Sequence, residues 1–200
     1  MNTKTGSAPR VSARERLLAA ADELFYENGI NTVGIDRVIE RAGVAKASLY
    51  DCFGSKDELV RSYLLARSEA RRARITERLS HYHTPEEKIL SIFDLLGELA
   101  AQPGFRGCAF VRAGADANSS DKVKSVCEQS RAFILGKFTD LAREAGASDP
   151  GLLGKQLVLL YDGASIAAYL DGNRDAASAA RTLAAQMLSS ARGAAKPSFA

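Results

Sequence analysis

The same signal for the start of a helix occurs three times in this chain, each time directly before a run of apolar residues. Residues 12–15 (SARE), 55–58 (SKDE) and 84–87 (TPEE) have the pattern of capping boxes, in which a hydroxyl accepts from the amide of a Glu three residues on, and that carboxylate accepts from the first amide. Ala and Leu supply 56 of the 200 residues, against 24 for Val, Ile and Thr, and their side chains lose little freedom in a helix. We therefore predict an all-α protein.

The spacing of the apolar residues predicts about nine helices. They begin near residues 13, 35, 46, 56, 85, 108, 121, 151 and 175. The five prolines, at positions 9, 85, 103, 150 and 197, lie at predicted helix starts or in connectors, so none of them interrupts a helix.

Composition excludes several classes of protein. No run of 18 apolar residues occurs, so no membrane span is expected. Residues 1–10 lack the apolar middle of a secretory signal, which predicts a cytoplasmic protein. Cys52, Cys108 and Cys127 are odd in number and form no CxxC pair, so no disulfide framework is expected. The formal net charge is only +3, and charge alone does not indicate binding to nucleic acid.

The signatures of catalysis and cofactor binding are missing from the sequence. It contains no Gly-rich phosphate loop, no GxSxG elbow and no HExxH motif. His81 and His83 lie close together, but no third ligand lies near them in the sequence, which favours a loop over a metal site. We expect a protein that is not an enzyme and that holds neither metal nor cofactor.

Residues 34–53 (GIDRVIERAGVAKASLYDCF) have the spacing of a helix-turn-helix motif. One apolar stripe ends before Gly43, and a second begins after it at Val44. Glycine suits the left-handed conformation that the turn requires, and buried Ile39 and Leu49 are expected to hold the two helices at a steep angle. The second helix, over about residues 46–52, then projects as a rigid probe whose width suits the major groove of DNA.

The polar residues of this second helix have the chemistry of DNA contacts. Lys46 and Ser48 lie near its N-terminus and can reach base edges or phosphates, while Tyr50 offers a ring to a thymine methyl group or a sugar and a hydroxyl to a phosphate. Lys56 lies in the first turn of the following helix, where the helix dipole disfavours a cation unless a phosphate binds there. Double-stranded DNA is therefore the predicted partner.

The first 60 or so residues resemble the DNA-binding domain of the TetR family of bacterial transcriptional regulators. The matching segments are RERLLAAADELFYENG at 14–29, AGV at 42–44 and LYxxFxSKxxL at 49–59. The resemblance implies an all-helical homodimer whose C-terminal domain binds a small effector that changes operator affinity. By motif position, the resemblance assigns five residues to DNA contact: Lys46, Ala47, Ser48, Tyr50 and Lys56. We add Thr32 to this predicted set.

Two residues depart from the family pattern, and a third carries a charge that would disfavour DNA. Ala45 stands where the family usually has a Ser or Thr as N-cap, a substitution that commonly costs about 1 kcal/mol. Cys52 replaces a His or Tyr, which removes one phosphate contact. Asp51, beside it, would repel a phosphate if it pointed toward the DNA.

These features divide the chain into four parts. We predict a flexible basic arm over residues 1–11, a helix-turn-helix DNA-binding domain over 12–56, a helical effector-binding and dimerisation domain over 57–193, and a tail over 194–200. Two reading helices on one face of DNA need half-sites about one helical turn apart, so we predict a palindromic operator.

The last two predicted helices are rich in small residues, which let helices approach closely. An apolar surface this extensive is rarely left exposed to water, so we expect these helices to form a four-helix interface between two subunits; core contacts within one subunit are the alternative. The predicted interface residues are Leu160, Gly163, Ala164, Ala167, Ala168, Ala180, Leu183, Ala184 and Met187.

The effector pocket is predicted from aromatic, aliphatic and thiol side chains on the helices expected to surround a cavity. Eight residues are assigned to its wall, with Arg112 as a polar anchor for an anion: Phe93, Leu96, Phe105, Cys108, Phe110, Cys127, Phe133 and Tyr161. The absence of Trp and the presence of only two Met favour an aliphatic or small aromatic effector.

The main hypothesis is a ligand-responsive repressor, and several alternatives remain. The chain could be an all-α enzyme, or a redox sensor acting through Cys52 or through Cys108 and Cys127, with the helix-turn-helix serving as a scaffold. It could also bind DNA without an effector. The arginine-rich segment 67–78 is either a solvated helix face or an additional DNA contact.

Overall fold

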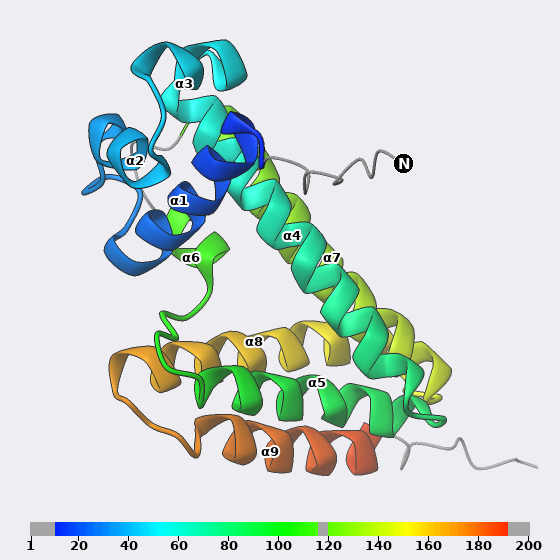
Figure 1. Cartoon of the computed structure of the whole chain (residues 1–200). Coiled ribbons are helices and arrows are strands. Elements are labelled where there is room, and N and C mark those ends of the chain that lie inside the picture. Colours follow the sequence, from blue (N-terminus) through cyan, green and yellow to red (C-terminus); the bar gives the residue numbers. More distant parts are fainter. Residues whose placement is uncertain (1–10, 116–119, 192–200) are drawn as a thin grey trace, which may run out of the picture.

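The computed structural model describes residues 11–115 and 120–191, and over these ranges it contains nine α-helices and no strand (Figure 1). The prediction of an all-α protein is confirmed. Most of the predicted basic arm and the whole predicted tail lie outside the described residues. The helices are α1 (Ala13–Asn28), α2 (Ile35–Ala42), α3 (Lys46–Phe53), α4 (Lys56–Ser80), α5 (Pro85–Ala100), α6 (Ala109–Gly114), α7 (Asp121–Glu144), α8 (Pro150–Leu170) and α9 (Ala176–Ala191).

Two of the three predicted capping boxes are complete. At the start of α1, the Glu15 amide donates to the Ser12 hydroxyl at 3.2 Å and the Ser12 amide donates to the Glu15 carboxylate at 2.8 Å. Thr84 and Glu87 make the same pair of bonds at the start of α5. Because these bonds favour the ionised carboxylates, they lower the pKa of both Glu15 and Glu87.

The third box, at the start of α4, is only half formed. The Glu58 amide donates to the Ser55 hydroxyl at 3.2 Å. The Glu58 carboxylate does not return to Ser55, because it pairs with Lys122 at the start of α7 and with Arg61 at 3.5 Å. A tertiary contact between α4 and α7 thus replaces the local bond that the sequence predicted.

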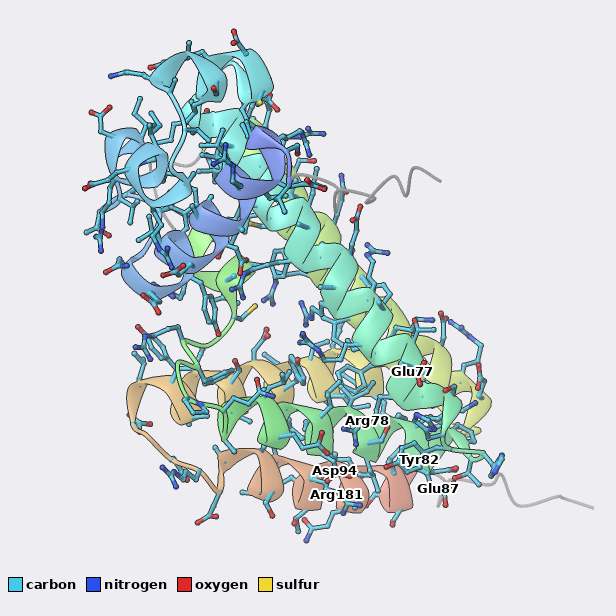
Figure 2. All side chains as sticks on the ribbon, in the orientation of Figure 1. Glu77, Arg78, Tyr82, Glu87, Asp94 and Arg181 are labelled. Atoms are coloured by element: carbon cyan, nitrogen blue, oxygen red, sulfur yellow. The ribbon has the colours of Figure 1, made fainter. Side chains whose placement is uncertain are left out.

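The long helices α4 and α7 run side by side and connect two groups of helices (Figure 1). Helices α1, α2 and α3 gather around the N-terminal end of α4, whereas α5, α8 and α9 form a layer at its other end. Side chains join the members of this layer: Arg181 on α9 forms an ion pair with Asp94 on α5 at 2.8 Å (Figure 2).

Each group of helices has its own hydrophobic core. The first core joins α1, α2, α3 and the start of α4 to α6 and the start of α7, with Leu17, Leu49 and Phe110 among its buried residues. The second core joins the C-terminal ends of α4 and α7 to α5, α8 and α9 around Phe93 and Phe138. The first core therefore extends beyond the predicted domain boundary at residue 56.

Helices α7 and α8 approach each other closely at Gly154. A Cβ atom at this position would lie 2.3 Å from Thr139 Oγ1 and 3.1 Å from the Thr139 backbone nitrogen. The missing side chain thus allows the two backbones to meet. Although α8 is long and apolar, no helix in the described part of the chain meets the length and hydropathy needed to cross a membrane.

Candidate functional site

The turn between α2 and α3 has the geometry that the sequence predicts. Gly43 ends α2 in the left-handed conformation (φ 61°, ψ 44°), and its amide donates to carbonyl oxygens of the last turn of α2. Leu49 is fully buried and Ile39 is half-buried against the first core. Ala45 is the N-cap of α3 and makes no side-chain capping bond, as the departure from the family pattern implied.

Helix α3 lies at the end of the molecule farthest from α5, α8 and α9 (Figure 1). Lys46 and Ala47 are exposed, Ser48 is half-buried, and the Tyr50 side chain is 46% exposed. Asp51 is exposed too. The outer face of α3 is thus uncovered by the described part of the chain, which leaves it free to enter a groove.

Lys46 is held by an acidic neighbour on α2. Its Nζ lies 3.0 Å from Asp36 Oδ1, and both side chains are well exposed. The hydrogen bond from Lys46 to Asp36 and the attraction between their charges raise the pKa of this lysine. A DNA phosphate would have to compete with Asp36 for the ammonium group.

Lys56 and Thr32 are directed at the turn that follows α1. Lys56 Nζ donates to the Ile30 carbonyl at 2.8 Å, and partial burial lowers the pKa of this lysine. The Thr32 hydroxyl donates to the carbonyl oxygens of Asn28 and Gly29. An ammonium group has three donors, so Lys56 can hold the turn and still offer N–H groups to a phosphate.

A cavity of about 670 Å³ lies between the first group of helices and the layer of α5 and α8. Its walls come from α1, α4, the C-terminal end of α5, the connector before α6, α6 itself and α8. Five of the nine predicted pocket residues line it: Leu96, Phe105, Cys108, Phe110 and Tyr161.

The other four predicted pocket residues are not among the residues that line this cavity. Phe93 is fully buried against Phe138 and Tyr161. Cys127 is buried in the first core. Phe133 stacks with Arg72, whose guanidinium carbon lies 4.3 Å from the centre of the Phe133 ring. Arg112, the predicted anion anchor, donates from Nη1 to the Tyr26 carbonyl at 2.7 Å.

Sequence reasoning missed the charged wall of the cavity. Arg67, Arg71 and Arg74 all line it, although the segment that contains them was interpreted as a solvated face or a DNA contact. Their spacing of four and three residues places them on one face of α4. That spacing was a usable signal, but the sequence does not say what the face meets.

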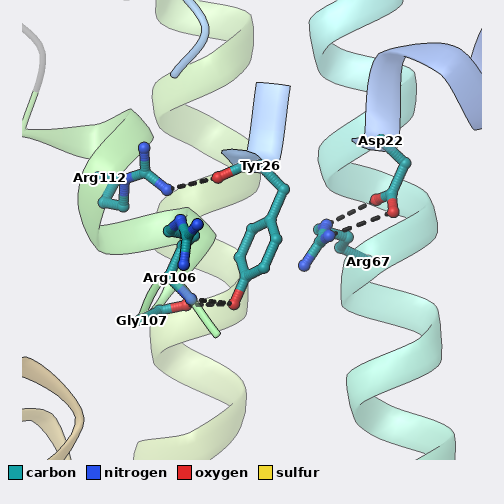
Figure 3. A network of polar contacts seen from close by, with 6 residues as sticks. All are labelled: Asp22, Tyr26, Arg67, Arg106, Gly107 and Arg112. Atoms are coloured by element: carbon teal, nitrogen blue, oxygen red, sulfur yellow. Dashed lines mark hydrogen bonds and ion pairs between the residues drawn. The ribbon is translucent and has the colours of Figure 1, made fainter. Parts of the chain in front are cut away.

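A network of polar contacts joins α1 to the cavity wall (Figure 3). Arg67 donates hydrogen bonds to both carboxylate oxygens of Asp22, at 2.6 and 3.1 Å. The guanidinium carbon of Arg67 also lies 3.7 Å from the centre of the Tyr26 ring. The Tyr26 hydroxyl accepts from the Arg106 amide at 3.0 Å and donates to the Gly107 carbonyl at 3.1 Å. The C-terminal half of α1 is therefore attached to both α4 and the connector that precedes α6.

The predicted dimer residues fall into two sets. Ala164, Ala180 and Ala184 are buried in the chain's own second core, which corrects the prediction for these three. They are covered because α8 and α9 pack on each other, with α7 and α5 behind them. The other six are exposed or half-buried: Leu160, Gly163, Ala167, Ala168, Leu183 and Met187.

Helix α8 also carries an exposed apolar stripe that the pattern of small residues did not predict. Leu152, Leu159, Ile166 and Leu170 are 45–72% exposed, and their spacing of seven, seven and four residues places them on one side of the helix. Leu183 on α9 is 48% exposed as well. An apolar surface of this kind is typical of a face that a partner covers.

The cysteines and histidines form no catalytic or metal constellation within the described ranges. Cys52 and Cys108 are half-buried, and burial raises the pKa of Cys127 to about 11. His81 and His83 are exposed. No group of three or more potential metal ligands occurs in residues 11–115 and 120–191.

An uncovered helix after a glycine turn, mounted on a helical body that holds a cavity, defines the class of helix-turn-helix regulators. The family model described as "Bacterial regulatory proteins, tetR family" matches residues 17–63. The chain is 31% identical to a TetR-family transcriptional regulator from Streptomyces coelicolor, SCO4454, with a TM-score of 0.85 over 90% of this chain and 95% of that one. A TetR-type regulator from Streptomyces avermitilis is 34% identical, with a TM-score of 0.81 over 91% and 99% of the two chains.

The chain belongs to the TetR family of transcriptional regulators. It is also 43% identical over 58 residues to the transcriptional activator FasR of Mycolicibacterium smegmatis, which covers 29% of this chain and 26% of that protein. The chain spans half or less of the length of FasR and of a second curated regulator, UidR of Escherichia coli. The alternative of an all-α enzyme loses its support, because this is a family of regulators and not of enzymes.

Proposed function

We propose that the protein is a homodimeric repressor that binds a palindromic operator and leaves it when a small molecule enters the cavity. The single observation that carries the DNA-binding part is the uncovered outer face of α3. Lys46, Ala47, Ser48 and Tyr50 are the proposed base and phosphate contacts, with Lys56 and Thr32 beside them. Because the proposed partner is operator DNA, we place the protein in the cytoplasm.

The proposed homodimer is supported by the apolar stripe of α8. Leu159 on this stripe is 72% exposed. Covering it in an interface would stabilise the dimer by about 25 cal/mol for each Å² of apolar surface removed from water. A second copy related by a two-fold axis would cover the same stripe on both subunits. It would also present two α3 helices to two half-sites about one helical turn apart.

The proposed response to a ligand is supported by the position of the cavity. Tyr26 and Asp22 line it and also belong to α1, whose end leads directly into α2 and α3. A ligand that moves these side chains moves α1. In a dimer, a small rotation of α1 changes the distance between the two reading helices.

The DNA contacts are tested by a gel shift on the DNA upstream of the gene. Lys46→Ala and Tyr50→Ala are expected to abolish binding while leaving the circular dichroism spectrum unchanged. Arg143→Ala is the matched control, because it removes an exposed cation at the far end of α7. Wild-type affinity in both α3 variants would refute the assigned contacts.

Two further measurements test the remaining parts of the proposal. Leu159→Glu is expected to convert the dimer into a monomer in sedimentation velocity, since the new carboxylates would lie in the proposed interface. In vitro transcription from the same promoter decides the sign of regulation. Increased transcript on addition of the protein would show an activator and refute the proposed repression.

A further inference from the structure

We propose that the cavity binds an organic monocarboxylate with an apolar body, and that Arg71 is the counter-ion of its carboxylate. This inference rests on the proposed function, because it assigns a ligand class to the proposed effector cavity. It differs from the prediction based on sequence, in which Arg112 was the anchor for an anionic ligand.

The three arginines on the α4 wall differ in what holds them. Arg67 is neutralised by the two-pronged contact with Asp22, and Arg74 is exposed to solvent. Arg71 is half-buried, and it takes part in none of the ion pairs of the described residues. Of the three, only Arg71 combines partial burial with the lack of a carboxylate partner in the described chain.

The side chains that contact Arg71 directly are neutral. Its Nη1 donates to Ser130 Oγ at 3.1 Å, and its guanidinium carbon lies 5.8 and 5.6 Å from the ring centres of Phe110 and Tyr161. Burial raises the pKa of Tyr161, so its phenol stays protonated at neutral pH. A guanidinium has five N–H donors, and a partly desolvated cation attracts an anion more strongly than one in bulk water.

The rest of the cavity suits an apolar body. Leu18, Leu96, Leu99, Phe105 and Phe110 line it. A volume of about 670 Å³ is in the range of cavities that enclose one small organic molecule. The proposed ligand therefore places a ring or a short alkyl chain against these side chains and its acid group at α4.

The charge of the lining favours a single negative charge on the ligand. Three arginines and two carboxylates, Glu15 and Asp22, line the cavity, which leaves one positive charge in excess. A phosphate ester with two negative charges would exceed this excess and leave one negative charge uncompensated. A monocarboxylate balances the lining, and its planar oxygens match the fork of a guanidinium.

The test is calorimetric titration of the full chain with three acids and their neutral amides. The probes are benzoate, 2-naphthoate and octanoate, each compared with its primary amide. We expect at least one acid to bind about tenfold or more tightly than its amide, since a hydrogen-bonded charge pair is worth that much in affinity. Inorganic phosphate, which lacks an apolar body, is expected not to compete with that acid.

Variants of α4 then assign the preference to one side chain. Arg71→Met is expected to reduce the ratio of acid to amide affinity to below about threefold. Arg71→Lys, which keeps a charge and a donor for Ser130, retains part of the preference and guards against a loss of folding. Arg72→Met is the matched control, because Arg72 lies one residue along the same helix but stacks on Phe133 outside the cavity.

The inference is overturned if no acid exceeds its amide, if phosphate displaces the acid, or if Arg71→Met and Arg72→Met have equal effects. Operator binding, measured separately with the same probes, distinguishes this failure from failure of the proposed function. An acid that binds through Arg71 without releasing DNA supports the ligand class and refutes the proposed response. Release of DNA by an amide alone supports the response and refutes the ligand class.

Discussion

Removing one hydroxyl group at Tyr26 should weaken the connection between α1 and the connector before α6. Tyr26→Phe removes the hydroxyl, and with it the hydrogen bond from the Arg106 amide and the hydrogen bond to the Gly107 carbonyl. These two partners are 80 and 81 residues away in the chain. The aromatic ring remains, so its contact with Arg67 at 3.7 Å is kept. The substitution therefore isolates two hydrogen bonds that link distant segments.

The expected magnitude follows from the number and burial of these bonds. Each contributes about 0.5–1.5 kcal/mol to stability, and both are partly buried on the cavity wall, where water can satisfy part of the lost pairing. We expect the free energy of unfolding to fall by about 1–2 kcal/mol. With a urea m-value of about 2 kcal/mol/M, the midpoint would shift by about 0.5–1 M.

Urea unfolding followed by circular dichroism measures this loss, at one protein concentration because a dimer's stability depends on it. Amide hydrogen exchange provides the local readout, and the Arg106 amide should exchange faster in the variant. Tyr50→Phe is the control: its hydroxyl makes no hydrogen bond to the described residues, so a change below about 0.5 kcal/mol is expected. Equal stability of Tyr26→Phe and Tyr50→Phe, with Arg106 still protected, would refute the reasoning.

Three further predictions concern other contacts. Gly154→Ala should lower the free energy of unfolding by about 1–3 kcal/mol, measured by urea unfolding, because its Cβ would overlap Thr139 between α7 and α8. Asp36→Asn should tighten operator binding about two- to fivefold in fluorescence anisotropy, since it frees the Lys46 ammonium from an exposed ion pair. Cys127, with a pKa raised to about 11 by burial, should resist iodoacetamide at pH 8, as peptide mass spectrometry would report, because the thiolate is the reactive form.

Each of these has a matched comparison within the chain. Gly136→Ala on α7 places its Cβ in open space and should not destabilise; equal losses in both glycine variants would contradict the close approach at α8. Asp140→Asn, at the far end of α7, should leave operator affinity unchanged. Half-buried Cys52 and Cys108 should be alkylated faster than Cys127, and equal labelling of all three would contradict the assigned burial.

Raised and lowered pKa values give the direction in which pH changes stability. The pKa of Cys127 is higher in the folded chain than in the unfolded chain. Its contribution to the free energy of unfolding is therefore complete below the thiol's ordinary pKa of about 8.5. This contribution is lost as the pH rises toward about 11. Glu15 and Glu87 have lowered pKa values. Their contribution is present above the ordinary Glu pKa of about 4.3 and is lost as the pH falls through the folded values.

The sequence alone determined the helices and the turn before α3, because these depend on residues only a few positions apart. The hydroxyl of Ser12 and the carboxylate of Glu15 meet wherever that segment is helical, and Gly43 takes its left-handed conformation from its own lack of a side chain. The outward position of Tyr50 came from the family resemblance by motif position, and Tyr50 is exposed on α3 beside Lys46.

Only the tertiary structure decided what each helix face meets, because that depends on segments far apart in the chain. Arg71 lies beside a cavity because α8 and α6 close around its face of α4, and Lys46 is paired because α2 brings Asp36 to it. The small residues Ala164, Ala180 and Ala184 fill the chain's own core, while larger leucines on α8 stay exposed. Small residues predict that two helices approach closely, but they do not say which helix is the neighbour. The neighbour is set by the packing of the nine helices of the described ranges into two cores.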